Sequence, residues 1–284
     1  METALGLPAP AKLNLFLHVT GRRDDGYHTL QTVFQLIDLA DWLDFERRDD
    51  GAIVRNGDLL SSASEDLAVR AARALQQATG CRLGATIRVT KQIPAGSGMG
   101  GGSSDAATTL IALNRLWDLQ LPRPDLARIA LPLGADVPFF LHGSNAFADG
   151  VGEQLQSVAL PAAWYAVIWP QVHVSTKEIF ANTGLTRNTK PTKIADFSAA
   201  AGLLPYALFG VNDLEPVARR QFPDIDQALG RLQRHGPARM TGSGSAVFMP
   251  TATEKDAVAA LAECPSGWRC WAVRGLSEHP LAVW

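Results

Sequence analysis

The chain has 284 residues, of which 46% are apolar and 19% are charged, and its formal net charge is −2. This composition is typical of a globular protein with one large or two modest domains. With a net charge of −2 the chain lacks the strong positive charge that would favour nucleic acid or an anionic membrane as a partner. The sequence has no apolar run near the roughly 20 residues of a membrane span. It has no signal-peptide pattern and no metal-binding cysteine or histidine spacing, so we expect a cytoplasmic protein.

The first third of the chain predicts strands and a helix around a polar loop. Residues 12–19 alternate between two faces, which predicts a half-buried strand with Lys12 and Asn14 on its polar face. From these residues alone, a solvent-facing position for both side chains is the simpler interpretation. The elements expected next are a hairpin-like loop at 21–30, a strand region at 31–45, a charged turn at 47–57 and a helix at 65–79.

The most distinctive segment is Pro94 to Ala107, because five of the seven residues from Gly96 to Gly102 are glycine. A strand-like segment at 85–90 precedes it, and a helix with one buried face at 105–117 follows it. A strand, a glycine loop and a helix N-terminus together form a phosphate site from backbone N–H groups. A flexible linker is the weaker interpretation, because a linker needs no such neighbours.

The start of this helix carries further expectations. Ser103 or Ser104 is a natural N-cap, and Asp105 would lie in the first turn, where the helix dipole favours a negative charge. The loop also fits the dinucleotide fingerprint formally, as G-x-G-x-x-G from Gly96 to Gly101. That fingerprint usually opens the first βα unit, whereas this loop lies a third of the way along the chain. The lysine of a P-loop is missing, since glycine follows Gly101.

The rest of the chain predicts a mixture of strands and helices. The expected elements are a short helix at 126–130, a strand and turn at 147–152, a strand at 164–169, a helix at 175–180, a loop-rich region at 181–197, helices at 198–209, 212–220 and 224–234, a second glycine loop at 239–248 that leads into a strand, a helix at 256–262 and a strand at 271–274. A domain boundary is expected near 155–160. Asp136 lies in the apolar stretch LGADVPFF, where a carboxylate needs partners or a catalytic task. A helix N-cap or a turn is an equally good interpretation of this residue.

Three segments together resemble the motifs of the GHMP kinase superfamily, in the family's order and at its spacing. They are PAKLNL at 10–15, the glycine loop at 94–107 and TGSG at 241–244. The resemblance implies an α+β, two-domain GHMP kinase fold. Its parts would be a ribosomal-protein-S5-like α/β domain at 1–157 and a ferredoxin-like α+β domain at 158–284.

The resemblance assigns the catalytic step to Lys12 and Asp136. Asp136 would accept the proton of an acceptor hydroxyl as it attacks the γ-phosphorus of ATP. Lys12 would keep that carboxylate ionised and stabilise the developing oxyanion. Mg²⁺ would spread the charge of the transferring phosphoryl group, with no protein ligand assigned to it. The implied ATP-binding residues are Asp66 and Lys91 at the adenine pocket and Pro94, Ala95, Gly96, Ser97, Gly98, Met99, Gly100, Gly101, Gly102, Ser103 and Ser104 in the loop.

The same resemblance favours a branch of the family whose acceptor is a small molecule, a cytidine diphosphate-linked methylerythritol of the non-mevalonate isoprenoid pathway. The loop GRRDDGYHTLQTVFQ and the stretch LGADVPFF carry this part of the resemblance. Tyr27 and Phe180 would stack on the cytosine ring, and His28 would read its polar edge. Asn14 would hold the methylerythritol end, and Thr176 completes the implied substrate-binding set.

Other interpretations stay open at this point. A homoserine- or mevalonate-type acceptor is the nearest, although such acceptors have no base for Tyr27 and His28 to recognise. A Rossmann-type oxidoreductase would use the glycine loop for NAD. A catalytically silent nucleotide-binding module would be expected to lack Lys12 or Asp136. Asp105 departs from the asparagine that often stands there in the family, which leaves its role open, and the oligomeric state is left between a monomer and a weak homodimer.

Overall fold

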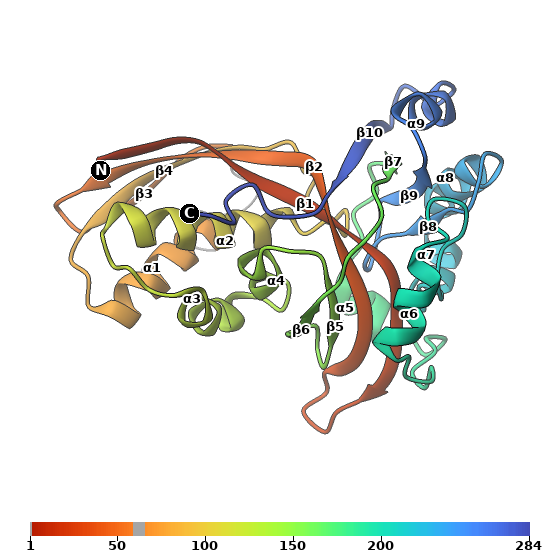
Figure 1. The fold of residues 1–284 in the computed structure, drawn as a ribbon, viewed down its shortest axis with the longest axis horizontal. Helices are drawn as coiled ribbons and strands as arrows, with labels where there is room; N and C mark the ends of the chain where they lie inside the picture. Colours follow the sequence, from red (N-terminus) through yellow and green to blue (C-terminus); the bar gives the residue numbers. More distant parts are fainter. Residues whose placement is uncertain (1, 59–65) are drawn as a thin grey trace.

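The computed structural model describes residues 2–58 and 66–284 (Figure 1). Two long strands, β1 (Thr3–Arg22) and β2 (His28–Arg48), extend across the molecule and pair antiparallel over nearly their whole lengths. They cover the strand regions predicted from the sequence and extend beyond them at both ends.

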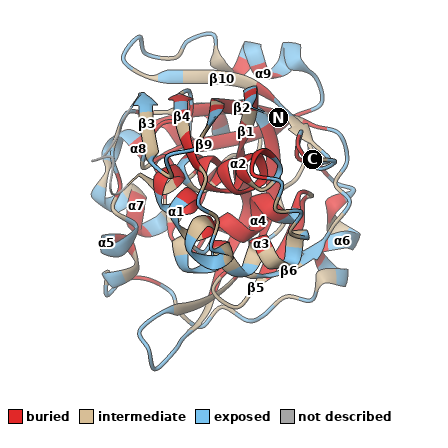
Figure 2. Cartoon of the chain, turned by 90° about the vertical axis from the view of Figure 1, so that its left-hand side faces the viewer, coloured by how far each residue is buried: buried red, intermediate tan, exposed pale blue. Residues whose placement is uncertain are grey.

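Strand β1 is buried on both faces from Ala9 to Val19. The strand predicted at 12–19 is confirmed in position, but its predicted half burial is wrong. Helix α2 (Gly101–Leu116) packs against β1, and the C-terminal half of the chain covers it elsewhere, so little of the strand reaches solvent (Figure 2). Lys12 and Asn14 are therefore buried, not solvent-facing.

In the N-terminal half, β2 pairs with β4 (Gly84–Thr90), and β4 pairs in parallel with β3 (Ile53–Gly57). The helices that pack here are α1 (Leu67–Thr79), α2, α3 (Arg123–Ala130) and α4 (Val137–His142), with a 3₁₀ turn at Leu131–Leu133 between the last two. The helix predicted at 65–79 is confirmed from Leu67, and its predicted first residue, Glu65, lies outside the described residues. The turn predicted at 47–57 is confirmed only at 49–52, because its two ends belong to β2 and β3.

The C-terminal half adds more strands and helices. Its strands are β5 (Ala146–Asp149), β6 (Gln154–Ser157), β7 (Trp164–Trp169), β8 (Arg239–Met240), β9 (Val247–Thr251) and β10 (Arg269–Leu276). Its helices are α5 (Thr176–Ala181), α6 (Ile194–Ala201), α7 (Glu215–Gln221), α8 (Pro223–Gln233) and α9 (Glu254–Leu261). Strand β10 pairs with both β2 and β7, and this joins the two halves into one sheet with the order β3-β4-β2-β10-β7-β9-β8.

Most elements predicted for the C-terminal half are confirmed to within a few residues, but the helix predicted at 198–209 is confirmed only as far as Ala201. Helix α6 begins at Ile194, inside the region predicted as a loop, and ends at Ala201. Gly202 and Pro205 follow it, and both residue types disfavour a continuing helix. The mixed arrangement of strands and helices confirms the α+β class, and the domain boundary near 155–160 stays a prediction.

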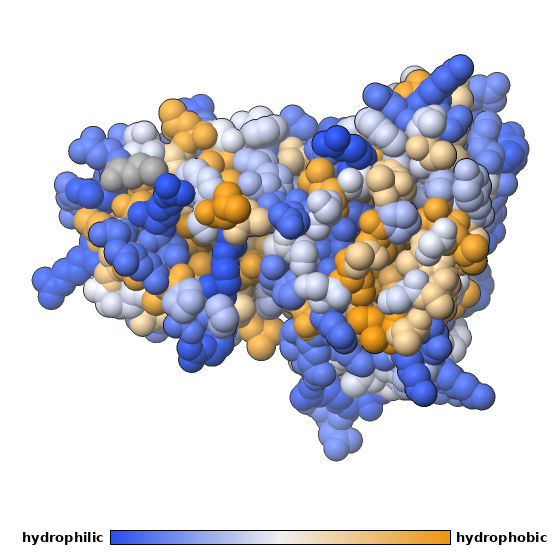
Figure 3. All heavy atoms as spheres, in the orientation of Figure 1, coloured by the Kyte–Doolittle hydropathy of each residue, from blue (hydrophilic) through white to orange (hydrophobic). Residues whose placement is uncertain are grey.

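The apolar side chains gather in three buried clusters along the sheet. The face drawn in Figure 3 is mainly polar, and apolar side chains gather on it beside α6. Among the helices of residues 2–58 and 66–284, none combines the length and hydropathy needed to cross a membrane.

Candidate active site

The glycine loop ends where α2 begins. Gly100 has a left-handed backbone (φ 76°) and occupies the N-cap position, and α2 starts at Gly101. The N-cap predicted at Ser103 or Ser104 is therefore wrong, and Asp105 lies beyond the first turn. Glycine permits this left-handed start without a side-chain cap. The first N–H groups of α2 have no acceptor within the helix, so they are available to a ligand oxygen.

The loop is held between β1 and the second glycine loop. The Lys12 N–H donates to the Met99 carbonyl (3.0 Å), and the N–H groups of residues 245–246 donate to other loop carbonyls (3.1 and 2.9 Å). A Cβ on Gly98, where φ is +80°, would lie 2.2 Å from the Thr241 carbonyl oxygen. The two glycine loops thus approach each other too closely for a side chain at Gly98.

A cavity of about 380 Å³, here called the small cavity, lies over the loop and the start of α2. Most of the predicted ATP-binding residues line it: Asp66, Lys91, Pro94, Ala95, Gly96, Ser97, Gly100, Gly101, Gly102 and Ser103. The other three lie elsewhere, because Gly98 lines a second cavity while Met99 and Ser104 are buried.

Asp66 uses its carboxylate within the protein. One oxygen accepts hydrogen bonds from the N–H groups of Ala68 (2.9 Å) and Val69 (3.3 Å), and so caps α1. The other oxygen pairs with Nε of Arg55 at 3.1 Å. Asp66 therefore shapes the wall of the small cavity by holding α1 and β3 together.

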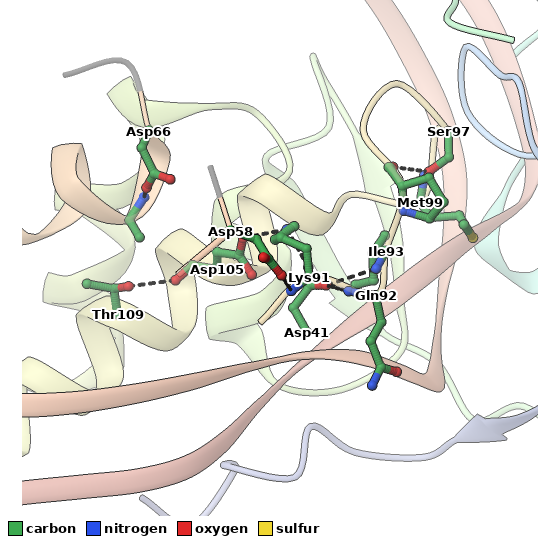
Figure 4. A network of polar contacts seen from close by, with 12 residues as sticks. Asp41, Asp58, Asp66, Lys91, Gln92, Ile93, Ser97, Met99, Asp105 and Thr109 are labelled. Atoms are coloured by element: carbon green, nitrogen blue, oxygen red, sulfur yellow. Dashed lines mark hydrogen bonds and ion pairs between the residues drawn. The ribbon is translucent and has the colours of Figure 1, made fainter. Parts of the chain in front are cut away.

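Lys91 has two carboxylate partners (Figure 4). Its Nζ lies 2.5 Å from Oδ2 of Asp41 and 2.6 Å from Oδ2 of Asp105. Oδ1 of Asp41 also accepts hydrogen bonds from the backbone N–H groups of Gln92 (2.5 Å) and Ile93 (2.8 Å), which lie just before the glycine loop. Burial lowers the pKa of Lys91, but Asp105 and Asp41 outweigh it and the pKa is raised. The Lys91 ammonium, which was predicted to line the adenine pocket, thus forms ion pairs with two aspartates.

Lys12 and Asp136 form a second, looser pair. Lys12 Nζ lies 3.5 Å from Oδ2 of Asp136, whose side chain is 34% exposed, and 5.2 Å from the centre of the Phe34 ring. Asp136 occupies the N-cap position of α4 but makes no capping hydrogen bond with its side chain. Burial lowers the pKa of Lys12, and the Asp136 carboxylate opposes this effect. The pair therefore combines a buried ammonium with a carboxylate that solvent or a ligand can reach.

Asn14 is fixed between β1, β2 and the second glycine loop. Its Oδ1 accepts a hydrogen bond from Lys12 Nζ, and its Nδ2 donates to Thr32 Oγ1 (2.9 Å). Its backbone N–H donates to Thr241 Oγ1 (2.9 Å). This network orients the lysine toward Asp136.

A larger cavity of about 750 Å³, here called the large cavity, opens over this pair. It is lined by all seven residues that were predicted to be catalytic or substrate-binding: Lys12, Asn14, Tyr27, His28, Asp136, Thr176 and Phe180. Gly100 lines both the small and the large cavity. The two cavities therefore meet at the glycine loop, beside Lys12.

Aromatic side chains lie at one end of the large cavity. The His28 and Phe180 rings are 5.0 Å apart between centroids and tilted by 32°. Tyr27 is 67% exposed and free to meet a ligand. Arg187 donates from Nε to Nε2 of His28 (3.0 Å). Burial lowers the pKa of His28, and the charges of Arg187 and Arg22 lower it further.

Sequence reasoning missed four charged residues here. Arg22 and Lys177 line the large cavity, and their only signal is that Arg22 lies within the predicted loop at 21–30 and Lys177 follows Thr176. Asp41 and Arg187 contact partners that are distant in sequence, so no local pattern marks them.

Comparisons with known proteins agree with this geometry. The family model "GHMP kinases N terminal domain" matches residues 66–144, and "GHMP kinases C terminal" matches residues 196–270. The chain is 55% identical over 278 residues to the 4-diphosphocytidyl-2-C-methyl-D-erythritol kinase of Aromatoleum aromaticum, with 98% of this chain and 95% of that protein covered. It is 56% identical to the corresponding enzyme of Cupriavidus metallidurans, with 97% and 94% covered.

A solved structure of 4-(cytidine 5'-diphospho)-2C-methyl-D-erythritol kinase has a TM-score of 0.82 and 36% identity, with 94% of this chain and 98% of that chain covered. Homoserine kinase from Cytophaga hutchinsonii shares the fold, with a TM-score of 0.71 at 18% identity and 98% and 96% of the two chains covered. The fold and the site define a small-molecule kinase of the GHMP superfamily. Within that superfamily, the chain belongs to the 4-diphosphocytidyl-2-C-methyl-D-erythritol kinase family.

Proposed function

We propose that this protein transfers the γ-phosphoryl group of ATP to the 2-hydroxyl of 4-diphosphocytidyl-2-C-methyl-D-erythritol, a step of non-mevalonate isoprenoid precursor biosynthesis. One observation carries the proposal: Lys12 and Asp136 lie where the small and large cavities meet, at Gly100. A phosphate donor in the small cavity and an alcohol in the large cavity would meet at this pair.

Asp136 is the proton acceptor in this proposal. As the acceptor oxygen forms its bond to the γ-phosphorus, its proton passes to the carboxylate and the bond from phosphorus to ADP breaks. The exposed side of Asp136 permits this contact, and the Lys12 ammonium lies 3.5 Å from its carboxylate. Lys12 then stabilises the negative charge that develops on the attacking oxygen.

The glycine loop and the start of α2 supply N–H donors to the phosphates of ATP. Mg²⁺ would add neutralisation of the phosphate charge when bound. No group of three or more His, Cys, Asp or Glu side chains in residues 2–58 and 66–284 is placed to hold a metal ion. This fits a Mg²⁺ that keeps water and phosphate ligands and takes only one or two protein oxygens. The Ser103 hydroxyl, which lines the small cavity, is a suitable donor.

The cytidine end of the acceptor would lie among Tyr27, His28 and Phe180, with Asn14 and Thr176 toward the reacting end. Thr176 Oγ1 shares a hydrogen bond of 2.7 Å with the Ser243 hydroxyl, which ties α5 to the second glycine loop. An aromatic end and a polar end in one cavity suit a ligand with a base at one end and a polyol at the other. The cytoplasmic location, the use of Mg²⁺ and the oligomeric state stay predictions.

A coupled assay of ADP release tests the acceptor. We expect turnover with the cytidine diphosphate-linked acceptor and, within detection, none with homoserine or mevalonate, with Asp136→Asn enzyme as the control for background ATP hydrolysis. A higher kcat/KM for homoserine or mevalonate would contradict the assignment. Saturable NAD binding would instead support the oxidoreductase interpretation, which this largely antiparallel sheet does not favour.

A further inference from the structure

One arginine connects the turn after α5 with the histidine of the large cavity. Arg187 lies in the segment between α5 and α6. Its terminal nitrogens donate to the carbonyl oxygens of Phe180 (2.9 Å), Asn182 (2.8 Å) and Leu185 (3.2 Å), while Nε donates to Nε2 of His28 (3.0 Å). The planar guanidinium has five donors in a fixed fork, and these four contacts fix its plane and direction.

The contact with Arg187 determines which nitrogen of His28 carries the proton. A guanidinium only donates, so Nε2 of His28 must accept with its lone pair. In the neutral ring the proton then lies on Nδ1. No hydrogen-bond partner of Nδ1 occurs in the part of the chain that the structure describes. Burial and two arginines lower the pKa of His28, which favours the neutral ring.

We propose that Arg187 is a positioning residue for base recognition, which holds His28 as the Nδ1–H tautomer so that the ring offers the base a donor and no acceptor. This inference rests on the proposed function. Arg187 also holds the Phe180 carbonyl, so one side chain sets the position of both rings.

The donor character of His28 decides which atom of the base it can read. At the 4-position cytosine carries an amino group and uracil an oxo group, so a donor there would favour uracil. At ring nitrogen 3, cytosine is an acceptor whereas uracil carries a hydrogen. A site that donates to nitrogen 3 pairs with cytosine and meets an unmatched donor in uracil. The contact that selects cytosine is therefore the one from Nδ1 of His28 to nitrogen 3.

The first test is the tautomer, which can be measured without substrate. A long-range proton–nitrogen correlation spectrum of the full chain should show His28 protonated on Nδ1, with the signal assigned by its loss in His28→Ala. Arg187→Met should give a mixture of tautomers. Arg220→Met is the matched control, because the Arg220 guanidinium lies beside Gly184 in the same turn. A wild-type ring protonated on Nε2 would overturn the inference.

The second test is specificity. Arg187→Met should raise KM for the cytidine acceptor about 2- to 10-fold, leave kcat nearly unchanged and reduce the preference over the uridine analogue. Arg220→Met should keep the wild-type preference. An equal fall in kcat/KM for the cytidine acceptor and the uridine analogue would mean that Arg187 only supports the turn, and would overturn its role in recognition. Wild-type enzyme that phosphorylates neither acceptor would contradict the proposed function, whereas the tautomer measurement would still report on Arg187.

Discussion

Two lysines whose side chains are at most 10% exposed flank the glycine loop, and their surroundings differ. Lys91 has two aspartates within 2.6 Å, and neither carboxylate is more than 9% exposed. Lys12 has one aspartate at 3.5 Å, and that carboxylate is 34% exposed. The pKa of Lys91 is raised because two carboxylates outweigh its burial, whereas the pKa of Lys12 is lowered because one does not.

The difference is the one expected between a structural ion cluster and the catalytic pair proposed above. Around Lys91 the charges satisfy each other, and Asp41 also holds the backbone that leads into the loop. Around Lys12 the compensation is incomplete, and the partner carboxylate faces a cavity. An incompletely compensated charge with access to a ligand is the arrangement expected of a catalytic group.

The largest expected effect is the loss of kcat when the pair of Lys12 and Asp136 is changed. Asp136→Asn should lower kcat by about 10²–10⁴, because the amide cannot accept the proton of the acceptor hydroxyl. The melting temperature should stay close to wild type, since Asp136 makes no capping bond. Steady-state kinetics and thermal melts check both, with exposed Asp224→Asn as the control. Wild-type turnover by correctly folded Asp136→Asn would remove the proposed base.

The cluster of Lys91, Asp41 and Asp105, here called the closed cluster, should affect the free energy of unfolding instead of kcat. Lys91→Met leaves two buried carboxylates without their cation, which should cost about 3–5 kcal/mol of unfolding free energy. Urea denaturation measures this loss, and the fraction that stays folded should keep most of its kcat. Lys12→Met is the matched comparison: its kcat should fall strongly with little change in stability and a smaller change in nucleotide affinity. The reverse pattern in the two variants would mean that the catalytic and structural roles are exchanged.

Motif spacing in the sequence was sufficient to bring the right segments together. The strand before the glycine loop and the second glycine loop are confirmed, and the first loop is confirmed as far as Gly100, where α2 begins. Only the family resemblance assigns Lys12 and Asp136 to catalysis. The local pattern fits a solvent-facing Lys12 and an N-cap or turn position for Asp136 at least as well as it fits catalytic roles. The structure places both side chains in one cavity, and their catalytic roles stay proposals.

Several of the misses share one physical cause, which is contact between residues distant in sequence. Both faces of β1 are covered by elements far along the chain, so alternation could not reveal that Asn14 is buried. The segment at 53–57 becomes a strand only by pairing with β4. Arg187 acquires its partner 159 positions away. The early start of α2 has a local cause, because left-handed Gly100 begins the helix before any serine can cap it.

The smallest expected effect is a change in how stability depends on pH, and it concerns Asp105 of the closed cluster. Burial, helped by the charge of Asp41, raises the pKa of Asp105 from 3.8 to about 7 against the effect of Lys91. Between these two values the folded chain binds more protons at this site than the unfolded chain. This contribution to stability is therefore present below pH 3.8 and is lost as the pH rises to about 7, with a slope of at most about 1.4 kcal/mol per pH unit for one proton.

Asp105→Asn should remove this contribution, because an amide does not titrate and still offers an oxygen to Lys91. Unfolding free energies measured by urea denaturation from pH 4 to pH 8 should fall less steeply in Asp105→Asn than in wild type, and kcat should change little. Exposed Asp224→Asn should keep the wild-type slope. If Asp105→Asn keeps that slope as well, another carboxylate carries the pH dependence. If its kcat falls instead, the cluster around Lys91 takes part in catalysis, and the contrast between the two lysines fails.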